Sequence, residues 1–286
     1  MIKKIIPIKS KIMLRDLYYN YKTKLFKYKD NKYISILSIQ KSGTNYLRLL
    51  LANYISLIND GEKVDFGELE RFYPNMRDWS ILGNKEYQQQ DKTKNLFGYD
   101  DLWYGHTFYG MNRLEGKKIL LYRNPLDMIV SYYNYKFINR PNKKDKYNSI
   151  SDSIEDIMKY AFIPHYLKIK TSNDKDIIKI QYEDLVTMPD DTLKKILEFL
   201  EIPVFDELVI KAIEYSSKKS VRDYENKVGK AINAPSDFVG SFVRSGKIGQ
   251  WKDSFNQDDI DTVNKLLLRY GVSLNEFITE EKVHSV

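Results

Sequence analysis

The chain has 286 residues, 42% of them hydrophobic, which is enough to bury a substantial core. It has no cysteine and only three scattered histidines, so disulfide frameworks, thiol chemistry and Cys-ligated zinc are excluded and no metal is expected. The formal net charge is +7, and residues 1–30 account for all of it, with nine Lys or Arg against two Asp. We expect a basic N-terminal segment, residues 1–30, followed by a single domain over residues 31–286.

The basic segment carries tyrosines as well as cations and could lie on an anionic membrane surface or bind nucleic acid. Most such charge runs are simply solvated. Its short apolar run is broken by Lys9 and Lys11, and no apolar run approaches membrane-spanning length, so neither a signal peptide nor a membrane span is expected. The sequence therefore favours a cytoplasmic protein with no nucleic-acid partner, and peripheral membrane contact stays an open alternative.

The first predicted strand covers residues 33–39, where apolar residues alternate, and it leads into a helix that ends near residue 57. The loop between them reads Gln40-Lys41-Ser42-Gly43-Thr44-Asn45-Tyr46. Unpaired N–H groups and the positive end of the dipole converge at a helix N-terminus, and Lys41 adds a full charge. The loop is therefore a candidate anion site. It is not a Walker A motif, because Gln40 and Ser35 stand where that motif has glycines.

Residues 65–104 and 140–151 are polar and are expected to be irregular and to shape an acceptor site. Shortly before the next strand, His106 is a candidate base, because a neutral imidazole can take a proton near pH 7. A purely structural histidine is the alternative.

The second predicted strand covers residues 118–122 and runs into Arg123-Asn124-Pro125, where Pro125 suits a first helical turn. The helix is expected to end near residue 137 and to carry Ser131. Arg123 can grip a phosphate with its planar fork, and Ser131 can donate one hydrogen bond. A simple ion pair between Arg123 and Asp127 is the alternative interpretation.

A third strand is predicted at residues 177–181, followed by Tyr182-Glu183-Asp184-Leu185. Further helices are expected at residues 154–168, 191–200, 207–215 and 257–270. Because strands alternate with helices, the sequence predicts an α/β fold of three layers, with a central parallel sheet flanked by helices and ligand loops at the strand C-terminal ends.

In this order the segments resemble sulfotransferases that use 3′-phosphoadenosine 5′-phosphosulfate (PAPS). Residues 41–46 are similar to the family's Lys-Ser-Gly-Thr-Thr-Trp loop, residues 123–131 to its 3′-phosphate loop, residues 182–185 to its Tyr-Glu-Asp-Leu turn, and residues 244–251 to its Arg-Lys-Gly loop with the following Gly-Asp-Trp. The resemblance covers residues 35 to about 268. It implies a P-loop-like nucleotide-binding architecture, PAPS as donor, PAP as product and no metal. The donor-binding residues that it implies are Lys41, Ser42, Gly43, Thr44, Asn45, Tyr46, Arg123, Ser131, Tyr182, Ser216, Arg244, Ser245 and Gly246.

The chain departs from the family pattern at several donor positions. Gln40 replaces a proline, Asn45 a threonine and Tyr46 a tryptophan. Lys218 stands where the family has an aromatic residue that stacks on adenine, and Ser245 replaces a lysine near the 3′-phosphate. At these positions we expect the contacts to the donor to differ from those of the family.

The resemblance implies that Lys41 and His106 are catalytic, with His106 as the base. Glu68, Glu70 and Asp101 stay open as alternatives, since some relatives use a glutamate. The expected reaction is in-line transfer of a sulfuryl group to a hydroxyl acceptor, either a carbohydrate or a small alcohol or phenol. A P-loop-type nucleotide kinase and a basic nucleic-acid or membrane-binding module are the alternatives from other classes.

Overall fold

The computed structural model describes residues 7–25, 32–69, 96–99, 101–106, 108, 111, 116–228, 237–241 and 246–277. Its four described strands form one parallel sheet in the order β2-β1-β3-β4, with β1 at Tyr33–Ser38, β2 at Asp101–Gly105, β3 at Lys118–Tyr122 and β4 at Ile177–Gln181. The chain leaves β1 towards β2 and leaves β3 towards β4, so the order reverses between β1 and β3. A crevice outside the carboxyl ends of strands at such a switch point is the usual place for a ligand in this fold class.

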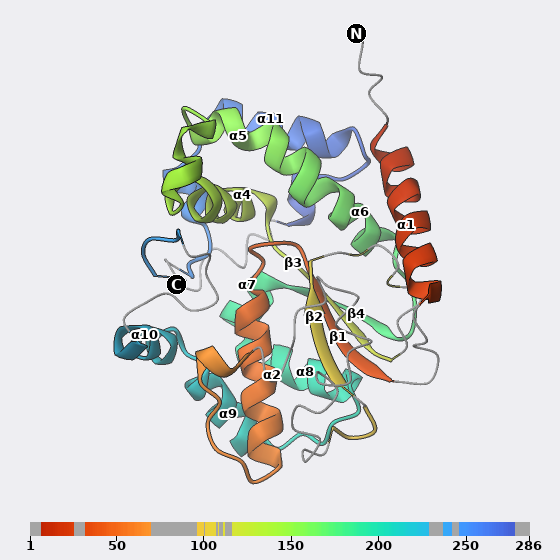
Figure 1. Cartoon of the computed structure of the whole chain (residues 1–286), viewed down its shortest axis with the longest axis vertical. Coiled ribbons are helices and arrows are strands. Elements are labelled where there is room, and N and C mark those ends of the chain that lie inside the picture. The colour runs from red at the N-terminus through yellow and green to blue at the C-terminus, as the bar shows by residue number, and fades with distance from the viewer. Residues whose placement is uncertain are drawn as a thin grey trace.

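Helices cover both faces of the sheet, which confirms the predicted three-layer α/β fold (Figure 1). One face packs against α4 (Pro125–Tyr133), α5 (Ile150–Ile157), α6 (Ile163–Thr171) and α11 (Gln257–Leu268). The other packs against α2 (Thr44–Ile58), α8 (Pro189–Phe199) and α9 (Asp206–Tyr215). Successive strand residues point to opposite faces, so Leu37 of β1 joins the first cluster and Ile36 joins the second.

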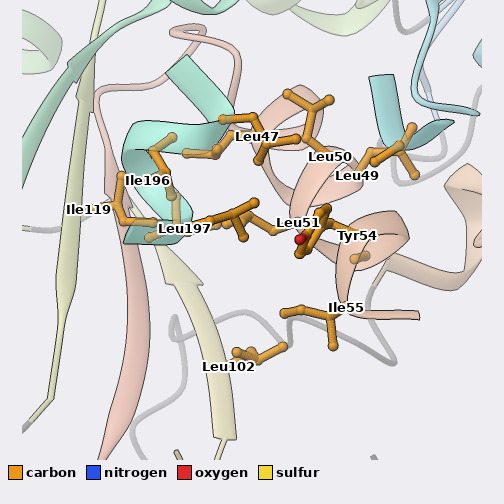
Figure 2. Packing of buried hydrophobic residues seen from close by; sticks show 14 of the residues in the cluster. Leu47, Leu49, Leu50, Leu51, Tyr54, Ile55, Leu102, Ile119, Ile196 and Leu197 are labelled. Atoms are coloured by element: carbon orange, nitrogen blue, oxygen red, sulfur yellow. The ribbon is translucent and has the colours of Figure 1, made fainter. Parts of the chain in front are cut away.

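Helix α2 lies in the second cluster, and this packing fixes where its N-terminus points. Its leucines, Tyr54 and Ile55 belong to one buried cluster with Leu102 of β2, Ile119 of β3 and Leu197 of α8 (Figure 2). Full burial of a leucine side chain contributes about 1.5–3 kcal/mol. A row of such residues holds the helix firmly enough to position the loop before it.

The remaining described elements are α1 (Ile8–Leu25), α7 (Tyr182–Thr187) and α10 (Lys218–Val228), with shorter helical turns. The 3-10 turns are η1 (Phe66–Glu68), η6 (Pro141–Lys146), η8 (Gln250–Asp253) and η9 (Leu274–Glu276). Two π-helical turns, η5 (Asn134–Ile138) and η7 (Met158–Phe162), continue α4 and α5.

The predicted strands match β1, β3 and β4 to within one residue. The helix predicted at residues 154–168 is helical throughout, but it begins earlier because Ser149 and Asp152 form a capping box, and it contains a π-helical turn. The irregular segment expected at residues 65–104 ends in strand β2, whose five residues become a strand by pairing with β1. In the other irregular segment, η6 is helical.

Candidate active site

A cavity of about 280 Å³ lies at the carboxyl ends of β1, β2 and β3. The loops after these three strands contribute Lys41, His106 and Arg123 to its wall. The π-helical turn η5 adds consecutive side chains, as π-helical turns often do at functional sites. The lining residues are Gln40, Lys41, Gly43, Thr44, Asn45, Tyr46, His106, Arg123, Ser131, Asn134, Tyr135, Lys136, Asn139, Arg140, Tyr182, Phe238, Ser241, Gly246 and Gln250.

The loop between β1 and α2 presents backbone donors to this cavity. Lys41 (φ 67°) and Gly43 (φ 88°) are both in the left-handed region, and Gly43 is the N-cap of α2 without a side-chain cap. Within the described part of the chain, the N–H groups of Gly43, Thr44 and Asn45 have no hydrogen-bond acceptor. Ser42 is fully buried, and its Oγ has no partner among the described residues. The loop has the donor set of an anion site.

The ring of Tyr182 packs directly against the loop at Gly43. A Cβ added to Gly43 would lie 2.3 Å from Cδ2 of the Tyr182 ring. We therefore expect Gly43→Ala to destabilise the protein by about 2–5 kcal/mol, the sum of left-handed strain and overpacking. Gly271→Ala is the matched control, since Gly271 (φ 69°) has nothing within 4 Å of the added Cβ and should show the strain alone. Urea unfolding measures both, and equal losses in the two variants would contradict the close contact.

Arg123 is buried at the cavity wall and stacks on Tyr182, with its guanidinium carbon 4.3 Å from the ring centroid. Its Nη2 donates to the carbonyl of Lys247 at 2.9 Å and lies 3.6 Å from the Asp127 carboxylate. The ion pair with Asp127 considered from the sequence is thus present, and Arg123 lines the cavity as well. The two interpretations are compatible.

Two buried carboxylates support Arg123 and its loops. Asp127 accepts hydrogen bonds from the N–H groups of Gly249 (2.8 Å) and Trp251 (3.1 Å), which ties η8 to α4. Glu183 accepts from the N–H of Asn124 at 3.1 Å. Burial raises the pKa of both carboxyls, and the positive charge of Arg123 opposes that rise.

His106 follows β2 directly, and its Nδ1 lies 3.1 Å from the carbonyl oxygen of Ser38 and 3.0 Å from its Oγ. A carbonyl oxygen can only accept, so Nδ1 carries the proton in the neutral ring and the lone pair is on Nε2. Ser38 also joins Thr44, with 2.6 Å between their hydroxyl oxygens. This chain of contacts connects the imidazole to the first turn of α2.

The other candidate bases are placed differently. Asp101 is the first residue of β2 and pairs with Tyr33. It therefore lies at the opposite end of the strand from His106. Glu68 is exposed and accepts from the N–H of Asp65 in a capping box. Glu70 lies outside the described residues.

A second histidine, His165 of α6, is half-buried with its Nδ1 inside the protein, and this burial lowers its pKa to about 4, with further contributions from His106 and Arg15. The imidazole of His165 binds its proton near pH 6.5 in the unfolded chain but only near pH 4 in the folded protein. Between these two pH values the unfolded chain therefore binds more protons than the folded protein. Folding stability should therefore fall as the pH drops through that window, by about 3 kcal/mol from this group. His165→Leu should remove that part of the loss when urea unfolding is measured at pH 7 and pH 4.5; an unchanged pH dependence would contradict it.

The remaining donor-site candidates are not all in one place. Tyr46, Ser131 and Gly246 line the cavity, and burial raises the pKa of Tyr46 to about 12. Ser216 is buried away from the lining and accepts a hydrogen bond from Asn53 Nδ2 at 3.3 Å. Arg244 and Ser245 lie outside the described residues.

Lys218, which stands where the family has an aromatic residue, begins α10. Its pKa is lowered by burial and by the nearby charges of Arg222 and Lys247. Positive charge is therefore concentrated where the start of α10 lies near Lys247.

Sequence reasoning missed several residues of the site. Tyr135 lies under the ammonium group of Lys41, with Nζ 4.1 Å from the ring centroid. Sequence reasoning also missed the long-range contacts of Ser38, Asp127 and Glu183, which join residues 59 to 124 positions apart in the chain. The π-helical turn that places Tyr135 has no local signal, whereas Ser38 could have been found as a polar residue at the end of a buried strand.

The sulfotransferase domain family model matches residues 31–270. Curated relatives include Sulfotransferase 6B1 of Danio rerio, 29% identical over 154 residues (52% of this chain and 50% of the relative), and Sulfotransferase 2A1 of Homo sapiens, 27% identical over 159 residues (53% and 55%). The chain spans about half the length of the curated relatives it matches.

Solved structures are similar over more of the chain. Mouse SULT7A1 in complex with PAP matches with a TM-score of 0.62 at 20% identity, covering 88% of each chain. Retinol dehydratase in complex with androsterone and PAP matches with a TM-score of 0.60 at 17% identity, covering 83% of this chain and 80% of the other. These likenesses show the shared fold, and the family model covers well over half of the sequence. This chain belongs to the sulfotransferase family.

Proposed function

We propose that the chain transfers a sulfuryl group from PAPS to a hydroxyl acceptor by in-line displacement. The observation that carries the proposal is that Lys41, Arg123 and His106 follow three different strands and line one cavity. An anion loop, a phosphate-binding arginine and a base are the three parts that this reaction needs.

The residues at the cavity fit a nucleotide that is anionic at two ends. The N–H groups of Gly43, Thr44 and Asn45 are available to the 5′ end, whereas Ser42 is fully buried and does not line the cavity. Arg123 and Ser131 also line the cavity and suit the 3′-phosphate.

When bound, PAPS supplies an activated sulfuryl group. Lys41 and the N–H groups at the start of α2 would stabilise the charge that develops on the leaving phosphate oxygen. His106, with its Nδ1 held by the Ser38 carbonyl, would accept the acceptor's hydroxyl proton on Nε2. Tyr135 holds the Lys41 ammonium at the cavity wall.

The reaction is tested by incubating the protein with PAPS and a panel of hydroxyl acceptors, and by following PAP and sulfated product by chromatography and mass spectrometry. We expect equal amounts of PAP and sulfated product with at least one acceptor. If PAPS is untouched across the panel while ATP with magnesium is turned over, the kinase alternative replaces this proposal.

We further propose a carbohydrate as the acceptor. Tyr135 and Phe238 lie at the cavity with ring centroids 5.3 Å apart and suit stacking on a sugar face. Asn134, Lys136 and Asn139 line the same wall and can bond to hydroxyl groups. Turnover with phenols alone, and none with mono- or disaccharides, would sink this part of the proposal.

We also propose contact between α1 and an anionic membrane surface. Met13, Leu14, Leu17 and Tyr18 are 54–63% exposed and lie on one side of a helix in a segment of net charge +7. Asp16, on another side, forms a salt bridge with Lys168 of α6 that docks the helix on the domain. Among the described residues, no helix is both long and apolar enough to cross a membrane.

Sedimentation with vesicles tests this contact. The full chain should bind phosphatidylserine-containing vesicles but not pure phosphatidylcholine, and Leu14→Ser with Leu17→Ser should weaken binding. Ile210→Ser is the matched control, since Ile210 is 63% exposed on α9. Vesicle binding unaffected by the α1 changes would refute the proposal, and binding to nucleic acid alone would favour the other alternative.

A cytosolic location is proposed as well, because two matched Arabidopsis thaliana relatives are named cytosolic sulfotransferases. Fractionation of cells that express the full chain tests it, and recovery only in a sealed organelle fraction would contradict it.

A further inference from the structure

Arg48 is a fully buried cation in the first turns of α2, one helical turn after the anion loop. Its Nη1 donates to Oδ1 of Asn45 at 2.7 Å, and its Nη2 donates to the carbonyl of Leu69 at 3.0 Å. The guanidinium also lies over the ring of Tyr104 in β2, 3.6 Å from the centroid. These contacts fix the guanidinium between α2, β2 and the segment after η1.

The side-chain amide of Asn45 has one acceptor end and one donor end. A guanidinium has donors only, so the end of Asn45 that meets Arg48 must be the carbonyl oxygen. The NH₂ group then points away from Arg48. Asn45 lines the cavity, next to the N–H groups that begin α2.

We propose that Arg48 is a positioning residue that locks the Asn45 amide with its NH₂ group towards the cavity, as a hydrogen-bond donor to the 5′ phosphosulfate end of the donor nucleotide. The inference rests on the proposed function. Without Arg48 the amide can rotate and present its oxygen, an acceptor, to an anion.

This arrangement accounts for the departure at Asn45 from the threonine of similar loops. A threonine hydroxyl rotates and donates wherever an acceptor is placed, so it needs no second residue to orient it. An asparagine side chain donates to the same acceptor as reliably as a threonine hydroxyl only if a neighbouring donor group holds the amide oxygen in the other direction. Arg48 sits three positions on, on the same side of the helix, where it can do this.

A double-mutant cycle on PAP binding tests the proposal by calorimetry, with Arg48→Met, Asn45→Thr and the two combined. Arg48→Met should weaken PAP binding about tenfold, the effect of one charge-oriented hydrogen bond. In the Asn45→Thr protein the same change should weaken binding less than threefold. Equal losses in the two backgrounds would overturn the proposal, because a general structural role of Arg48 acts whatever residue is at position 45.

Arg269→Met is the charge control, since Arg269 is exposed after α11 and its loss should leave PAP binding unchanged. If Arg48→Met does not fold, the wild-type protein gives the answer by NMR with ¹⁵N-labelled asparagine side chains. The Asn45 NH₂ signal, assigned by its absence in Asn45→Thr, should shift on addition of PAP. A signal that stays in place while PAP binds would overturn the inference alone, whereas a wild type that binds no PAP would overturn the proposed function.

Discussion

Lys41→Ala should lower kcat by about 10²–10³-fold while the protein stays folded. Lys41 lines the cavity at the start of α2, where its ammonium group and the free N–H groups act on the same developing charge. Since an interaction made mainly in the transition state affects kcat more than binding, the affinity for PAP should fall much less.

The measurement is steady-state turnover of PAPS, with calorimetric PAP binding beside it. Lys252→Ala is the control, because Lys252 is exposed and does not line the cavity. A Lys41→Ala enzyme with more than a third of the wild-type kcat would show that the loop binds an anion without taking part in the chemistry.

His106→Gln should lower kcat by about 10²–10⁴-fold, the usual contribution of a general base. The wild-type rate should decline towards acidic pH as the imidazole becomes protonated, and this limb of the profile should vanish in the variant. The Nδ1 contact with the Ser38 carbonyl, at 3.1 Å, leaves Nε2 as the basic nitrogen.

Ser38→Ala distinguishes the base from its support. It removes the Oγ contact at 3.0 Å but keeps the carbonyl that fixes the tautomer, so the loss should be under tenfold and the acidic limb should remain. If His106→Gln keeps near-normal turnover and the wild-type pH profile, His106 is structural and the base is another group.

The strand and helix around the anion loop could be predicted because their signals are local. Residues 33–39 alternate, the next helix has apolar residues at helical spacing, and Gly43 sits where a left-handed N-cap is needed. The same holds for Pro125 at the first position of α4, which Asn124 caps. In these segments the chain neighbours decide the structure.

Strand β2 and the support of the site could not be predicted in this way. β2 becomes a strand because it pairs with β1, and the orientation of His106 depends on Ser38, 68 residues earlier. Ser216, a small hydroxyl in a loop by sequence, is buried against Asn53 of α2. Arg48 looks like a surface residue of an amphipathic helix, and only tertiary packing buries it.

We expect the cavity lined by Lys41, His106 and Arg123 to bind a 3′-phosphorylated adenine nucleotide. The most direct measurement is the melting temperature of the full chain with PAP and, separately, with ADP and magnesium, each at the same saturating concentration. At one hundred times its Kd, PAP should stabilise the folded state by about 2.7 kcal/mol and raise the melting temperature by about 5 °C, and ADP with magnesium should have little effect. A rise with ADP and magnesium but none with PAP would show that the cavity is not a site for a 3′-phosphorylated nucleotide.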